Sequence, residues 1–140
     1  MTEKQIQAID DKKWFILLVS RVIGFLVAGY AVFVFYTIDG EQPSYINRFI
    51  VAPGFVGAFI GIFALYFIDF VGAYAVVALQ GIAILITAFI AWSAFIHMGF
   101  IIYYRKIYDR TAYYKSFLIF IILWVLGALI SIPPSEPWAD

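Results

Sequence analysis

The sequence predicts an all-α integral membrane protein, a bundle of four transmembrane helices forming one domain over residues 1–140. Composition is the first reason: the chain is 65% hydrophobic and 13% charged, with a mean hydropathy of +0.97. A soluble domain is about 45–50% apolar and about 25% charged. A soluble fold of this size could not cover so much apolar surface with polar residues. The second reason is that four segments each reach the ~20 apolar residues that a helix needs to cross a bilayer.

The first predicted helix runs over residues 14–38 and is interrupted only by Arg21. Residues 1–13 are polar and of mixed charge, unlike a cleavable signal peptide. The second predicted helix covers residues 49–70. Pro53 lies near its start, where it either opens the helix or kinks it after a short interfacial turn.

The third predicted helix covers residues 73–104, with a preceding hairpin at Asp69–Gly72. An alternative places the break at Gln80–Gly81 and buries Asp69 in the membrane. At 1.5 Å per residue this helix is about 48 Å long, so it must tilt, bend or project into water. The fourth covers residues 112–132, capped by Asp109 or Thr111 and ended by two prolines.

Four crossings would place residues 1–13 and the loop 103–115 on opposite sides of the membrane. Basic residues then divide three against five, which favours a cytoplasmic location for the loop under the positive-inside rule. The three are Lys4, Lys12 and Lys13, and the five are Arg48, Arg105, Lys106, Arg110 and Lys115. The first helix, which often dominates insertion, favours the opposite orientation.

Small residues recur four positions apart in two of the predicted helices. Gly24 and Ala28 form one pair, and Gly57 and Gly61 form the other. Such spacing lets membrane helices approach closely, and close packing drives their association. The two pairs are therefore either a docking face for another subunit or contacts within this bundle.

Several classes of activity are excluded. The chain contains no cysteine, so it cannot form a disulfide, a thiolate metal site or an iron–sulfur cluster. Its single histidine cannot build a dihistidine metal site. Net charge is zero without a long basic run, so nucleic acid is not an expected partner. Neither a glycine-rich phosphate loop nor a nucleophile elbow is present. We therefore expect no catalytic residues and no metal site.

A few polar residues remain as candidates for binding a ligand or lining a transport path. Arg21 either extends to the headgroups, where it contacts a bound lipid, or meets a quinone or a haem propionate. His97 is either an interfacial polar residue or one axial ligand of a haem b whose second ligand comes from another subunit. Asp69 or Gln80 would line the water-filled path of a small transporter or channel.

The stretch "SRVIGFL" at residues 20–26, then His97, then "YYRKIYD" at 103–109 resembles the cytochrome b anchor subunits of succinate dehydrogenase. The resemblance covers less than a fifth of the chain. It implies roles in binding quinone or haem for Ser20, Arg21, His97, Arg105 and Asp109. The chain departs from the pattern because it lacks the second histidine and the glycine after the ligand. The spacing from His97 to Asp109 also differs, and those anchors usually have three crossings.

Taken together, these features predict an accessory, structural integral-membrane subunit of a larger complex, without catalysis of its own. We expect a respiratory or other oxidoreductase assembly, active in electron transport, in a prokaryotic cell membrane or an equivalent energy-transducing membrane. Its partners would be the lipid bilayer and other membrane subunits. The alternatives are a haem b- or quinone-binding anchor that uses Arg21 and His97, and a small transporter or channel.

Overall fold

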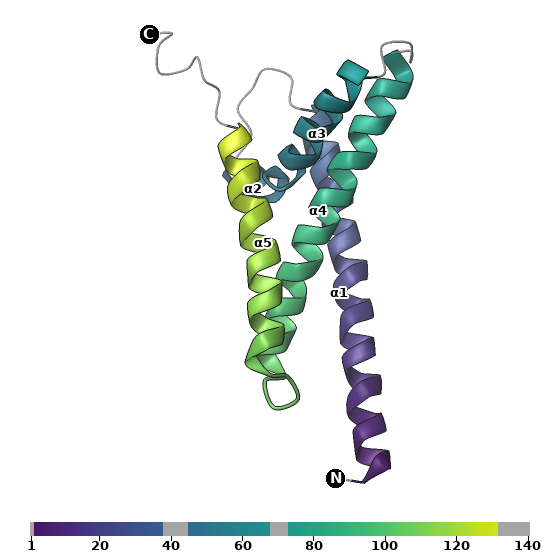
Figure 1. Ribbon diagram of the computed structural model, residues 1–140, viewed down its shortest axis with the longest axis vertical. Coiled ribbons are helices and arrows are strands. Elements are labelled where there is room, and N and C mark those ends of the chain that lie inside the picture. Colours follow the sequence, from purple (N-terminus) through teal and green to yellow (C-terminus); the bar gives the residue numbers. More distant parts are fainter. Residues whose placement is uncertain (1, 38–44, 68–72, 132–140) are drawn as a thin grey trace.

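A computed structural model describes residues 2–37, 45–67 and 73–131 of this chain, and within them all regular structure is helical (Figure 1). The elements are α1 (Glu3–Thr37), α2 (Tyr45–Val51), α3 (Gly54–Phe67), α4 (Ala73–Tyr103) and α5 (Arg110–Ser131). The all-α prediction is confirmed.

Three stretches of the described helices are long and apolar enough to cross a membrane: α1, Ala78–Tyr103 of α4, and Arg110–Ile130 of α5. They indicate a membrane protein. The sequence predicts four spanning helices, whereas the described residues contain three helices that are long and apolar enough. Helix α3 is described over 14 residues, about 21 Å of helix, which is shorter than a ~30 Å hydrocarbon core, and the residues that follow Phe67 lie outside the described part of the chain.

Helix α1 begins at Glu3, well before the predicted start at Trp14, so the polar N-terminal residues continue the helix. A reciprocal cap explains this start. The Gln5 N–H donates to Thr2 Oγ1 over 3.3 Å, and the Thr2 N–H donates to Gln5 Oε1 over 3.1 Å. At 35 residues α1 is about 52 Å long, so its polar first turns extend beyond any ~30 Å apolar layer.

The predicted second helix is divided into α2 and α3 by a break at Ala52 and Pro53. Proline has no N–H, and its ring clashes with the carbonyl four residues earlier, here that of Phe49. That carbonyl instead accepts a hydrogen bond from Trp124 Nε1 at 3.2 Å. The next carbonyl, of Ile50, accepts one from Trp92 Nε1 at 2.8 Å. Both residues of the break are buried, so its backbone is enclosed by protein.

Helices α1 and α3 both run antiparallel to α4. Along α1, Gly24 lies against Ser93, and Lys12 lies over the ring of Tyr104. Along α3, Gly54 meets Ile84 and Gly61 meets Gln80. Helices α1 and α3 are therefore parallel to each other, and the chain between them doubles back.

As a result, the N-terminus and the loop 104–109 lie at the same end of the molecule (Figure 1). This overturns the expectation that they lie on opposite sides. That expectation required the segment 49–70 to cross in the direction opposite to α1.

Helix α4 continues without interruption through Gln80 and Gly81, so the alternative break at these residues is wrong. The hairpin at Asp69–Gly72 lies outside the described residues, as do the turns at 39–44 and the prolines 133 and 134. Helix α5 begins at Arg110, and Asp109 is its N-cap: its Oδ1 accepts the N–H of Ala112 at 3.1 Å.

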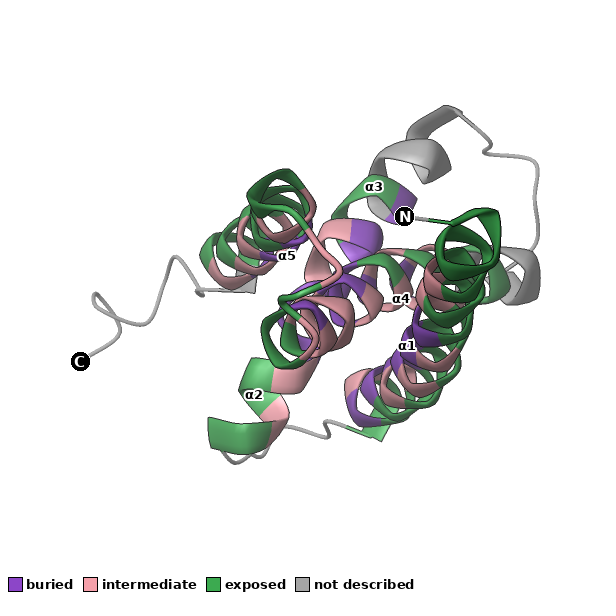
Figure 2. Ribbon diagram, turned by 90° about the horizontal axis from the view of Figure 1, so that it is seen from below, coloured by how far each residue is buried: buried purple, intermediate pink, exposed green. Residues whose placement is uncertain are grey.

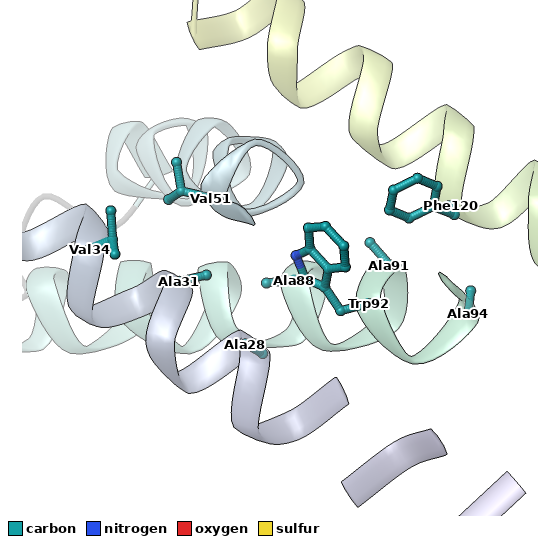
Figure 3. Close-up of a cluster of buried hydrophobic side chains, with 9 residues drawn as sticks. All are labelled: Ala28, Ala31, Val34, Val51, Ala88, Ala91, Trp92, Ala94 and Phe120. Atoms are coloured by element: carbon teal, nitrogen blue, oxygen red, sulfur yellow. The ribbon is translucent and has the colours of Figure 1, made fainter. Parts of the chain in front are cut away.

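Helix α4 is the centre of the bundle, and Figure 2 shows α1 and α5 on opposite sides of it. Small residues fill the α1–α4 contact, and aromatic rings fill the space between α2, α4 and α5 (Figure 3). Between ring centroids, Phe120 of α5 lies 4.8 Å from Phe95 and 5.3 Å from Trp92. The ring centroid of Phe49 on α2 lies 5.3 Å from that of Trp92. The buried cluster consists of Ala28, Ala31, Val34, Val51, Ala88, Ala91, Trp92, Ala94 and Phe120.

Candidate functional site

A small polar cluster gathers around His97, towards the end of α4 that carries the loop 104–109. The His97 ring is half-buried, and its Nδ1 lies 3.4 Å from the hydroxyl of buried Ser116 on α5. Which of the two donates depends on the imidazole tautomer. Tyr108 packs edge-on against the His97 ring at 5.7 Å between centroids. The cluster thus joins α4, α5 and the loop between them.

Basic residues of α1 reach the same region. Arg21 is exposed on α1, at about the level of His97, because Gly24 of α1 packs against Ser93 of α4. Just over two turns nearer the N-terminus of α1, Lys13 Nζ lies 5.3 Å from the centre of the Tyr108 ring. Lys12 Nζ lies 4.4 Å from the centre of the Tyr104 ring. These cation–π contacts hold α1 level with the loop 104–109.

Two hydroxyl groups in this half of the bundle are buried and have no hydrogen-bond partner among the described residues: Ser93 Oγ and Tyr108 Oη. Burial also raises the pKa of the Tyr108 phenol above its usual value, because ionisation would place a charge where water is largely excluded. Tyr108 therefore stays neutral over the physiological range.

The five residues suggested by the resemblance to cytochrome b anchors do not form one site. Ser20 is fully buried and donates to the carbonyl of Ile16 in its own helix at 2.8 Å. The antiparallel packing of α1 on α4, with Gly24 against Ser93, places Arg21 and His97 at a similar level of the bundle. Arg105 and Asp109 instead line a surface hollow at the α4–α5 end, of about 490 Å³, which shares Tyr108 with the His97 cluster but does not include Arg21 or His97. Only Arg21 and His97 therefore remain as a pair that a shared ligand could contact.

Metal binding finds little support in the geometry. Over the described ranges, no group of three His, Cys, Asp or Glu side chains converges. A haem held by His97 would need its second protein ligand from another chain, since this chain has one histidine. Gln80, proposed for a transport path, is half-buried against Gly61, with 3.3 Å between its Cα and the position of a Gly61 Cβ. Asp69 lies outside the described residues.

The paired small residues are used inside the bundle. A Cβ at Gly24 would lie 2.7 Å from the Ser93 nitrogen, and one at Gly57 would lie 2.7 Å from the Ile84 nitrogen. Ala28 is fully buried in the core between α1 and α4. These faces hold α1 and α3 against α4, and their atoms are not open to a partner.

Gly99 differs from the paired glycines, because a Cβ there would meet nothing within 4 Å. It lies in an apolar hollow of about 620 Å³ on the lateral surface, between α1 and α4. The lining consists of Ile23, Phe95, Ile96, Gly99, Phe100, Tyr103 and Tyr104. A small residue ringed by aromatic side chains thus forms an apolar recess on the lateral surface. Sequence reasoning missed it; the signal was a glycine with aromatic residues one, four and five positions away.

Sequence reasoning also missed Trp92 and Trp124, the two donors to the break before α3. The available signal was Pro53 itself. A proline within an apolar segment frees carbonyls that need donors, and tryptophan is an apolar residue that carries one.

Comparisons with known protein families, with curated proteins and with solved structures gave no significant match. The class that the fold defines is therefore a membrane protein with three long apolar helices. The site residues have to be judged on their geometry.

Proposed function

We propose that this chain is an accessory, non-catalytic integral-membrane subunit that packs sideways against another membrane protein in a respiratory or other oxidoreductase complex. The observation that carries the lateral packing is the hollow at Gly99. The assignment to an electron-transport complex is supported by two properties of the chain alone: it is a small membrane chain, and it has no evident catalytic group.

The bundle is open, which supports a partner. Only 28%, 22% and 17% of the most apolar windows of α1, α4 and α5 are buried within the chain. Lipid tails can cover exposed isoleucine and leucine side chains. A recess over a glycine offers something more specific, because membrane helices associate by close van der Waals packing at small residues. A large side chain from a neighbouring helix would fill this recess.

The test is to fill the hollow from within. Gly99→Leu places its Cβ in open space and directs the rest of the side chain into the hollow. Gly29→Leu is the matched control, because Gly29 is the other described glycine with nothing within 4 Å of its Cβ position. After mild detergent extraction, native electrophoresis with mass spectrometry should show the wild type and Gly29→Leu together with another membrane subunit. Gly99→Leu should migrate alone.

Two results would contradict the proposal. One is a wild-type chain that migrates as a lone monomer in every mild detergent. The other is a Gly99→Leu chain that keeps the complex as well as Gly29→Leu does.

We further propose three crossings of a prokaryotic or equivalent energy-transducing membrane, with α2 and α3 as a re-entrant pair. The break at Ala52–Pro53 lies level with Ile84, about 16 Å along α4 from its first residue. Irregular backbone is tolerated at such depth only where protein encloses it, as the two indoles do here. The end with the N-terminus and loop 104–109 carries seven of the nine basic residues, which favours the cytoplasm.

A quinone-binding role is the second candidate, and the placement of Arg21 and His97 at a similar level of α1 and α4 favours it. Ile96, adjacent to His97, lines the apolar hollow that would hold a ring and tail. Solvent extraction of the purified protein should then release a quinone, less so from His97→Ala and no less from Arg48→Gln. A Soret band lost in His97→Ala would instead establish haem. A preparation with neither would exclude both.

A further inference from the structure

We propose that the hollow where α4 meets α5 binds the headgroup of an anionic phospholipid. It has a volume of about 490 Å³ and opens on the surface beside the loop 104–109. Arg105 and Arg110 line it, on either side of the loop. This site is separate from the Gly99 hollow and does not rest on the proposed function.

The two arginines are free to bind an anion. Asp109 is the nearest acid in sequence, lines the same hollow and caps α5 through its Oδ1, so the lining carries two positive charges against one negative. Within residues 2–37, 45–67 and 73–131, neither arginine makes an ion pair, and both side chains are exposed. Guanidinium groups bind phosphate through paired hydrogen bonds, so two of them suit a phosphodiester.

The surroundings match a lipid better than a soluble anion. The floor of the hollow includes Ile101 and Ile102 in the last turn of α4, which offer an apolar surface to an acyl chain. Tyr113 and Tyr114 form another wall, and tyrosines at this level are typical of the headgroup layer. One opening thus presents cations to a phosphate and apolar atoms to a tail.

The charge of the whole end supports an anionic rather than a zwitterionic lipid. Seven basic residues gather there against four acidic ones, and three of the acids are on the first turns of α1. Helix α1 projects past the loop at that end (Figure 1). The basic residues at the α4–α5 loop therefore face the lipid surface with little acidic competition.

The experiment is a lipid titration followed by native mass spectrometry of the detergent-solubilised full chain. The probes are phosphatidylglycerol and phosphatidylcholine. We compare wild type with Arg105→Gln/Arg110→Gln, and with Lys4→Gln/Arg48→Gln, which removes the same charge from positions that do not line the hollow. Each cation near an anionic surface contributes about a factor of five, so the first variant should bind phosphatidylglycerol about 25-fold more weakly. The control should bind it as the wild type does, and phosphatidylcholine should bind weakly to all three.

Equal binding of the two lipids would overturn the proposal, as would an equal loss in the control. Full displacement of phosphatidylglycerol by millimolar inorganic phosphate would also overturn it, by identifying a soluble anion as the ligand. If the double glutamine variant loses helical circular dichroism, Arg105→Lys/Arg110→Lys takes its place. It keeps the charge but not the paired hydrogen bonds, so it should retain the preference for phosphatidylglycerol with reduced affinity.

Discussion

Trp92 donates its indole N–H to the carbonyl oxygen of Ile50 over 2.8 Å, across 42 positions of the sequence. The pair joins the centre of α4 to the helix break before α3. A second indole, of Trp124 on α5, donates to the neighbouring carbonyl of Phe49 at 3.2 Å. The carbonyls that Pro53 frees are thereby satisfied by two side chains from the last two helices.

Trp92→Phe should destabilise the protein by about 1–2 kcal/mol, because it leaves a buried acceptor unpaired while keeping an aromatic ring. Trp92 is 4% exposed, so water cannot replace the lost donor. Unfolding in mixed detergent micelles, followed by circular dichroism, measures the change. Trp14→Phe is the control, since Trp14 is 65% exposed on α1. Equal stability of the two variants would show that the indole hydrogen bond contributes nothing.

Gly127→Ala should destabilise the protein more than the addition of a single methyl group suggests. A Cβ at this position of α5 would collide with the carbonyl oxygen of Ala52 and lie 3.1 Å from the Cα of Pro53. Both obstacles are backbone, so α5 has to move away at a cost of about 1–3 kcal/mol. The same unfolding assay should show Gly29→Ala unchanged or up to about 1 kcal/mol more stable, because alanine favours a helix and has open space there. A Gly127→Ala protein as stable as Gly29→Ala would refute this packing.

Single cysteines can test the three-crossing topology, since the chain contains none of its own. Ala8→Cys and Thr111→Cys lie at one end of the bundle and Tyr45→Cys is on α2; all three positions are exposed. In intact cells, a membrane-impermeant thiol reagent should leave Ala8→Cys and Thr111→Cys unlabelled until the membrane is opened. Tyr45→Cys should react from outside. Opposite behaviour of Ala8→Cys and Thr111→Cys would restore four crossings.

Alkaline pH should weaken the fold partly through Tyr108, whose pKa burial raises. In the unfolded chain this phenol ionises near pH 10, while in the folded protein it keeps its proton to higher pH. The stabilisation is thus complete below pH 10 and is lost as the pH rises through and beyond that value. Tyr108→Phe should flatten this part of the stability profile between pH 9.5 and about 11. Parallel profiles for the variant and the wild type would contradict the assignment.

Local patterns in the sequence predict much of the fold. Composition predicts helices in lipid, and the all-helical structure confirms the helical part. Asp109 at the start of α5 is predictable because an N-cap acts within three residues. The reciprocal cap of Thr2 and Gln5 at the start of α1 is equally predictable, because it too acts within three residues. Apolar periodicity alone does not reveal it, because the helix continues beyond the end of the apolar stretch.

Long-range relationships account for what the sequence does not predict. Whether Pro53 opens a helix or breaks a segment depends on donors at Trp92 and Trp124, dozens of positions away. The direction of α3 follows from that break, and the number of crossings follows from the direction. The approach of His97 to Ser116 likewise depends on how α5 packs, not on residues near either one.

The break before α3 also bears on how the protein is made. A ribosome releases the chain from its N-terminus, so Pro53 enters the membrane before either indole that satisfies the freed carbonyls exists. Until α4 and then α5 arrive, these carbonyls must keep water or lipid headgroups as partners. If α2 and α3 form the proposed re-entrant pair, we expect this pair, although synthesised early, to reach its final depth last, and the insertion of α5 to be the step that completes the bundle.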